Sequence, residues 1–344
     1  MLRALASRLA LAAAAIAATL GLAEAGARLL APGWAPQHAE RNFWRHDALL
    51  GWAHRPGQSG TLDHPDFSVR VEISAQGLRD REYPLERAPG RRRMLVLGDS
   101  FAWGFGVERD RVFDALLEAR HPDWEIVNAA VSGYGTDQQL LYFERRGLRF
   151  QPDVVVLFFH PNDVEDNGEA RRYGYPKPRF ALGPGGLELE NVPVPRPGLR
   201  WRLRRFLLQS SYLYNRLERA RELLEAGEAP QPRRATLAGF PGPGDARRPD
   251  FATTAALLAA LREQAAQGGA RLVVVSAPGP AWIRDALART LGPLDVPYRP
   301  LDEAFRGRPA GEYKFANDPH WNAAGQRIAA EAVEAFLVEL GLFP

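Results

Sequence analysis

Ser100 stands at the end of a short, continuously apolar run. Met94 to Leu97 have the pattern of a buried strand that stops at Gly98, so the serine falls where a parallel strand passes into a helix. In open α/β sheets, ligands bind at this edge. A serine hydroxyl there acts as a nucleophile when a base takes its proton and donors hold the oxyanion that forms. Three later segments carry residues that can supply these groups: Ser132-Gly133-Tyr134-Gly135, Asn162-Asp163 and Asp318-Pro319-His320.

The glycine-rich segment from Gly98 to Gly106 does not fit a nucleotide-binding loop. A phosphate-binding loop needs Gly-Lys-Ser/Thr after four spacer residues, and no lysine lies near; the dinucleotide pattern G-x-G-x-x-G is also absent. The nucleophile elbow G-x-S-x-G is not matched either, because Ala102 stands at the last glycine position. These departures argue against a standard α/β-hydrolase and leave serine catalysis open.

Strands and helices alternate around these residues. Continuously apolar strands separated by helices predict a parallel sheet covered on both faces. The predicted strands are Met94 to Leu97, Glu125 to Asn128, Val154 to Phe159 and Leu272 to Val275. The predicted helices lie near Val112 to Glu118, after Thr136, near Phe251 to Gln267, near Trp282 to Leu291 and from about Asn322 to Leu340.

Two segments break this alternation. Residues 32–90 lack a long helical period, and the alternation from Phe67 to Ile73 predicts a strand in a small β-rich segment. Residues from about 165 to 250 form an insertion in the main domain, which spans 91–344. The second part of the insertion has apolar residues at helical spacing opposite arginines. We expect a helical cap whose apolar face packs on the sheet domain; the alternative is a basic amphipathic helix on an anionic membrane or polysaccharide.

The run Gly98-Asp99-Ser100 after a buried strand resembles the signature of the SGNH/GDSL hydrolases. The family's other pieces follow in its order: Gly133 after the second strand, Asn162 just after the third, and His320 before the last helix. The resemblance covers about Arg93 to Leu340. It implies a flavodoxin-like, three-layer α/β sandwich with a parallel sheet, and an esterase, lipase or acyltransferase that uses serine. No metal and no organic cofactor is implied.

Each of these residues has a chemical role to fill. His320 fits the base, because histidine titrates near neutral pH and can later protonate the leaving group. The backbone N–H groups of Ser100 and Gly133 and the side-chain amide of Asn162 are the candidate donors to the oxyanion. A glycine at position 133 permits a positive φ and a close approach of the backbone. The alternatives are that Gly133 only makes a turn and that Asn162 only caps a loop.

The acid that orients His320 departs from the family pattern. Many members place an aspartate three residues before the histidine, and here that position is Asn317. Asp318, two residues before, is the only carboxylate of the segment, and its Asp-x-His spacing resembles the alginate-type polysaccharide O-acetyltransferases. We predict that Asp318 accepts a hydrogen bond from His320 Nδ1–H. In the alternative, Asn317 or a backbone carbonyl holds the histidine.

Aromatic side chains follow the proposed reacting residues. Trp103, Tyr134 and Trp321 offer flat apolar surface for a sugar ring or a short acyl chain if they line one cleft, and His160 is a fourth candidate for the lining. Packing in the core is the alternative for the three larger rings, and a lone histidine is more often structural.

Composition limits the other classes of function. The chain has 344 residues and a net charge of +3, its arginines and acids are interleaved, and we therefore do not expect it to bind nucleic acid. The absence of cysteine excludes disulfides, thiolate metal sites and cysteine catalysis.

The N-terminus has the pattern of an export segment. Arg3 and Arg8 precede an uncharged run from Leu9 to Ala23, so residues 1–31 are a signal peptide or a membrane anchor, with 9–31 as the anchoring part. Ala23-Glu24-Ala25 offers a cleavage site, yet apolar character resumes at Ala27. Both alternatives place the remainder outside the cytoplasmic membrane, in the periplasm or another extracytoplasmic location. A third is an amphipathic helix on a cytosolic enzyme.

These observations predict an exported serine esterase that acts through an acyl-enzyme on a short-chain ester, with an acetyl group on a carbohydrate as the expected substrate. The first alternative is an O-acyltransferase that modifies a cell-envelope polysaccharide. It shares the same triad and differs in whether water or a sugar hydroxyl resolves the acyl-enzyme. The second alternative is a non-catalytic binding protein on the same scaffold.

Overall fold

A computed structural model of the chain describes residues 2–30, 43–87, 89–172, 174–226 and 251–344. The first residues of the predicted β-rich segment and the last part of the predicted insertion lie outside the described residues. The chain divides into two compact units, one made of residues 1–40 and 197–234 and the other of residues 41–196 and 235–344.

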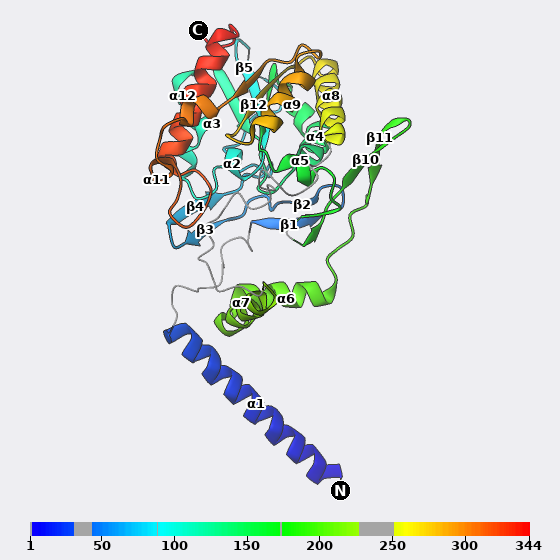
Figure 1. The fold of residues 1–344 in the computed structure, drawn as a ribbon, viewed down its shortest axis with the longest axis vertical. Coiled ribbons are helices and arrows are strands. Elements are labelled where there is room, and N and C mark those ends of the chain that lie inside the picture. The colour runs from blue at the N-terminus through cyan, green and yellow to red at the C-terminus, as the bar shows by residue number, and fades with distance from the viewer. Residues whose placement is uncertain (1, 31–42, 88, 173, 227–250) are drawn as a thin grey trace. The chain divides into compact units, whose positions relative to one another are not determined.

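The larger unit contains a five-stranded parallel sheet (Figure 1). Its strands are β5 (Arg92–Gly98), β6 (Trp124–Asn128), β7 (Val154–Phe159), β12 (Arg271–Ser276) and β13 (Tyr298–Pro300). Their order is β13-β12-β7-β5-β6, so the first strand of the sheet lies between the second and the third. This is the flavodoxin-like order, and it confirms the predicted parallel sheet.

Helices cover both faces of this sheet. On one side, α3 (Phe113–Arg120) packs against α12 (Ala323–Glu339). On the other side, α4 (Thr136–Arg145) packs against α8 (Ala252–Gln267), which packs against α9 (Ala281–Leu291), as Figure 1 shows. The predicted three-layer α/β sandwich is therefore confirmed.

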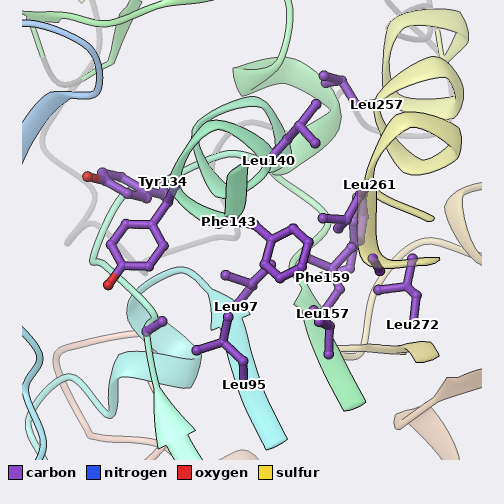
Figure 2. Packing of buried hydrophobic residues seen from close by; sticks show 14 of the residues in the cluster. Leu95, Leu97, Tyr134, Leu140, Phe143, Leu157, Phe159, Leu257, Leu261 and Leu272 are labelled. Carbon is purple, nitrogen blue, oxygen red and sulfur yellow. The ribbon is translucent and has the colours of Figure 1, made fainter. Parts of the chain in front are cut away.

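The core follows the two-residue period of the strands. Leu95 and Leu97 of β5 point to the α4 and α8 side, where they join Phe143 and Leu261 in one buried cluster (Figure 2). Each fully buried leucine or phenylalanine side chain contributes about 1.5–3 kcal/mol. The sheet is therefore a rigid base for the loops at its carboxyl edge.

Two antiparallel hairpins precede the sheet. They pair β1 (Trp44–Asp47) with β2 (Gly51–His54), and β3 (Ser59–His64) with β4 (Phe67–Glu72). The predicted β-rich segment and its strand at Phe67 thus form in the structure.

The insertion contains strands that the sequence did not predict. The strands are β8 (Arg171–Arg172), β9 (Tyr175–Pro176), β10 (Arg179–Gly183) and β11 (Gly186–Glu190), which pair as two short hairpins. The predicted helical part is α6 (Leu199–Ser210) and α7 (Tyr212–Ala226), which belong to the smaller unit together with α1 (Leu2–Leu30).

The expectation of an apolar face packed on the sheet domain stays a prediction; within the smaller unit, Leu203 and Phe206 of α6 are each 55% exposed. Short helical turns complete the described chain: α2 (Ser100–Trp103), α5 (Asp163–Asp166), α10 (Asp302–Phe305), α11 (Ala310–Tyr313) and 3-10 turns at Arg109–Arg111 and Gly147–Phe150.

Candidate active site

Ser100 begins α2 directly after β5. A Cβ atom at Gly98 would lie 2.6 Å from the Cβ of Ala102, so only glycine lets the chain turn this sharply. Asp99 caps the turn, because its Oδ1 accepts a hydrogen bond from the N–H of Phe101 at 2.9 Å. The serine is 8% exposed. Its hydroxyl therefore sits in a fixed position at the carboxyl edge of the sheet.

His320 lies against this serine. Its Nε2 is 2.7 Å from Ser100 Oγ. The histidine is positioned by the start of α12, where the Oδ1 of the N-cap Asn322 accepts hydrogen bonds from the N–H groups of Ala324 and Gly325. The structure thus brings together a hydroxyl and a base that lie 220 residues apart in sequence.

Asp318 lies on the other side of the imidazole. Its Oδ1 is 2.6 Å from His320 Nδ1 and accepts a second hydrogen bond from the His320 N–H at 2.9 Å. Burial raises the pKa of this carboxyl, but the hydrogen bonds and charge of His320 outweigh burial and hold the pKa below its ordinary value. An ionised Asp318 fixes the proton on Nδ1 and leaves Nε2 to accept from the serine.

Asn317 donates its hydrogen bonds away from the histidine. Its backbone N–H and its side-chain Nδ2 both donate to Asp66, at 2.7 and 2.6 Å. The neighbouring residue therefore ties the histidine loop to the turn between β3 and β4, while Asp318 faces the imidazole.

Gly133 lies in the loop after β6 with φ of 80°, which few residues other than glycine adopt. The N–H of Val131 donates to Gly98 O at 3.1 Å and brings this loop beside the one that carries Ser100. Among the described residues, none accepts a hydrogen bond from the N–H of Ser100 or Gly133. Both groups are thus available to a ligand oxygen.

Asn162 follows β7 and precedes α5. Its Nδ2 donates to Asp166 Oδ2 at 2.8 Å, and its Oδ1 contacts His160 Nδ1. His160 in turn stacks on the ring of Phe101 with the centroids 4.4 Å apart. Because a primary amide carries two hydrogens, Asn162 keeps one for a ligand while its orientation is fixed from both ends.

Three of the predicted lining residues belong to the core. Trp103, Tyr134 and Trp321 are 2%, 1% and 2% exposed. Trp103 Nε1 donates to His54, the Tyr134 hydroxyl donates to Trp52 O, and Trp321 stacks on Phe305. The prediction that they offer surface to a substrate does not fit this burial. The reason is that two of the rings find polar partners in the N-terminal hairpins and the third finds a ring in α10.

A different set of aromatic rings extends from His320. The centroid of Phe105 is 4.6 Å from the imidazole, Phe67 lies 5.6 Å from Phe105, and Phe315 lies 4.8 Å from Phe67. All three rings are half-buried. Phe105 follows Ser100 by five residues, and Phe315 precedes His320 by five residues. These short separations are the sequence signal that could have indicated both rings. Nothing in the sequence places Phe67 there.

Arg79 is a further residue that the sequence analysis did not predict at the site. Its guanidinium is 3% exposed and donates to the carbonyl oxygens of Trp103, Gly104 and Val107 at 2.5–2.8 Å. These carbonyls belong to the loop that follows Ser100 and carries Phe105. Arg79 therefore holds this loop in place.

Comparison with known proteins agrees with this geometry. A model of the GDSL-like Lipase/Acylhydrolase family matches residues 96–328, which include Ser100, Gly133, Asn162 and His320. A search of curated proteins finds no match. These comparisons do not show the resemblance to alginate-type O-acetyltransferases.

Several solved structures are similar to the chain at low identity. TesA has 17% identity and a TM-score of 0.42, over 72% of this chain and 99% of that one. A psychrotrophic esterase EstA from Pseudoalteromonas sp. has 13% identity and a TM-score of 0.42, over 72% and 97%. A lipase/acylhydrolase from Enterococcus faecalis has 12% identity and a TM-score of 0.41, over 72% and 96%. Because the family model matches well over half of the chain, the protein belongs to the GDSL-like lipase/acylhydrolase family.

Proposed function

We propose that the protein is an exported serine esterase that removes an acetyl or similarly short acyl group from a carbohydrate ester through an acyl-enzyme. Its family makes it an ester-hydrolysing enzyme. The observation that carries the mechanism is the continuous line of hydrogen-bond distances from Ser100 Oγ through His320 to Asp318. Serine activation needs such a line, with the base between nucleophile and acid.

The proposed reaction has two halves. His320 Nε2 takes the proton of Ser100 as its Oγ attacks the ester carbonyl, and Asp318 stabilises the imidazolium that forms. The tetrahedral oxyanion accepts hydrogen bonds from the N–H groups of Ser100 and Gly133 and from Asn162 Nδ2. Collapse breaks the C–O bond to the alcohol, which leaves with the proton from His320. Water then attacks the acyl-enzyme by the same route and releases the acid.

The surroundings of Ser100 support a small acyl group on a ring-shaped alcohol. The serine is nearly buried, which limits the room beside it. The half-buried rings of Phe67, Phe105 and Phe315 offer flat apolar surface, on which the apolar face of a sugar ring can stack. The apolar N-terminal helix supports export to a compartment where envelope carbohydrates occur.

The test uses the full chain in detergent, assayed for acid release from aryl esters of increasing acyl length and from an acetylated oligosaccharide. We expect the rate to be highest for acetyl and to fall with chain length. Ser100→Ala and His320→Ala should each abolish turnover, while Ser68→Ala, on the exposed side of β4, should not. Retained activity in either site variant would contradict the proposed triad.

The same assay separates hydrolysis from transfer. Unacetylated oligosaccharide is added as acceptor, and the products are analysed by mass spectrometry. Free acetate that the acceptor does not divert supports the esterase. Acetyl groups on the acceptor would instead make the protein an O-acyltransferase. A rate that rises with acyl length would contradict the short-chain proposal and leave the triad intact.

A further inference from the structure

The smaller unit joins the N-terminal helix to the helical part of the insertion. The carboxylate of Glu24 in α1 accepts hydrogen bonds from Ser211 Oγ at 2.7 Å and from the N–H groups of Tyr212 and Leu213 at 3.0 and 3.1 Å. These are the first N–H groups of α7, which otherwise lack partners within their helix. Arg28 of α1 pairs with Glu24 and donates to Ser210 O at 3.3 Å. A residue of α1 thus caps α7.

This cap bears on whether α1 is removed. Cleavage after Ala25, at the signal-peptidase pattern Ala23-Glu24-Ala25, would separate Glu24 from α7. The segment Leu5–Leu30 has a mean hydropathy of 1.8 and none of its apolar window is buried within the chain. At 1.5 Å per residue, 26 residues extend over about 39 Å, against roughly 30 Å for the hydrocarbon of a bilayer. The length of the apolar segment and the cap that Glu24 provides for α7 both favour a retained anchor.

Helix α6 combines an exposed apolar stripe with positive charge. Leu199, Leu203 and Phe206 are 78%, 55% and 55% exposed, and at 100° per residue they lie within about 60° of one face. The exposed Arg200 and Arg202 flank this stripe on its two sides, and α6 has four arginines and no acidic residue. An apolar stripe between arginines suits the boundary between acyl chains and anionic headgroups.

We propose that α1 is retained as a membrane anchor and that α6 binds the surface of the same bilayer through anionic lipid headgroups. The connection through Glu24 ties α6 and α7 to a helix that is long and apolar enough to cross a bilayer. A carbohydrate partner would leave the leucines of α6 facing a polar ligand, so the lipid surface fits both the charge and the apolar stripe. This proposal does not depend on the substrate of the enzyme.

The absence of cysteine makes a direct test simple. Leu203→Cys in the full chain is labelled with an environment-sensitive dye and reconstituted into vesicles of phosphatidylethanolamine with phosphatidylglycerol, or of phosphatidylcholine alone. Val338→Cys on α12, 44% exposed, is the matched control in the other unit. Ester hydrolysis by each labelled variant confirms that it is folded.

In the anionic vesicles we expect lipid-attached quenchers to quench the label at position 203 and aqueous iodide not to reach it, with the opposite result at position 338. Arg200→Gln with Arg202→Gln should shift α6 toward solvent by about fivefold for each arginine removed. Iodide access at position 203 in both kinds of vesicle would overturn the proposal. So would shielding of the label in lipid-free detergent that grows with protein concentration, because a second copy would then cover the stripe.

Retention of the anchor has its own readout. The intact mass of membrane-extracted protein should include residues before Ala25. A mass that begins after Ala25 would overturn the anchoring half of the proposal.

Discussion

Asp318 and Asn317 are adjacent in sequence but have different partners. Asp318 lies against His320, whereas Asn317 is held by Asp66. Only Asp318 is placed to stabilise the imidazolium as Ser100 loses its proton. We predict that Asp318→Asn lowers kcat on the order of 10⁴-fold, and that Asn317→Ala lowers it by no more than about tenfold. Steady-state kinetics on an aryl acetate measure both, and the reverse ranking would give the orienting role to Asn317.

Asn162 is the side-chain donor of the proposed oxyanion site. Asp166 and His160 hold the two ends of its amide, so the remaining N–H has a fixed direction. Asn162→Ala should lower kcat by about 10²–10³ with little change in KM, since the donor acts on charge that develops in the transition state. Asn162→Asp keeps the shape of the side chain but replaces the amide donor with a carboxyl. Its kcat should fall at least as far as that of Asn162→Ala. A loss below about tenfold in both variants would remove Asn162 from the site.

The positions of the candidate site residues could be predicted because each one stands next to an element with a clear sequence pattern. Ser100 and Asn162 follow apolar strands, and His320 precedes a helix whose N-cap is recognisable as Asn322. Burial of the large aromatic residues was not predictable in this way. Trp103 is buried because its indole N–H finds His54, a partner 49 residues away that only the folded hairpin brings near.

At the scale of elements, the loop after Ser100 depends on Arg79. Arg79→Met keeps much of the side-chain volume but removes the arginine's hydrogen bonds to three loop carbonyls. We expect a loss of about 3 kcal/mol in the free energy of unfolding, together with a lower kcat, because Phe105 and the turn beside Ser100 lose their support. Urea unfolding and kinetics on an aryl acetate test this expectation.

The matched control for Arg79 is Arg81→Met, which removes a half-exposed pair with Glu118 and should cost about 1 kcal/mol or less. Equal losses in the two variants would show that Arg79 does not support the loop more than an ordinary surface arginine does.

The elements of the sheet domain were predictable to within a few residues, because their apolar runs are long and lie between helical periods. The predicted strand Val154 to Phe159 has the same bounds in the structure. Strand β13 was missed because it has only three residues, all half-buried, and so shows no apolar run in the sequence. The hairpin β10–β11 was missed because a segment rich in glycine and proline read as irregular.

At the scale of the whole molecule, the separation into two units was not predictable from periodicity. The spacing of Leu203 and Phe206 predicts an amphipathic helix but does not say what covers its apolar face. The assignment of α6 and α7 to the unit of α1 depends on Glu24, a single carboxylate that pairs with α7 across almost 190 residues. Such long-range contacts leave no periodic signal in the sequence.

The N-terminal hairpins are joined to the catalytic domain through a histidine that is neutral in the folded protein. His54 is fully buried between Gly77 O, 2.8 Å from its Nδ1, and the indole N–H of Trp103, 2.9 Å from its Nε2. Burial lowers the pKa of His54 to about 4, with a smaller opposing effect from the hydrogen bond to Gly77. An unfolded histidine titrates near 6.5. Between these values the unfolded chain binds a proton that the folded chain does not.

Stability from His54 is therefore present in full above about pH 6.5 and is lost as the pH falls toward 4, by about 3 kcal/mol in total. Asp166 has the opposite dependence, because burial raises its pKa to about 7 and its ionisation disfavours the folded state as the pH rises. The comparison of wild type with His54→Gln, by urea unfolding from pH 7 to 4, isolates the histidine. The gap between the two proteins should narrow as the pH falls. A constant gap would mean that His54 takes up its proton at the same pH in the folded and the unfolded chain, and would contradict the lowered pKa.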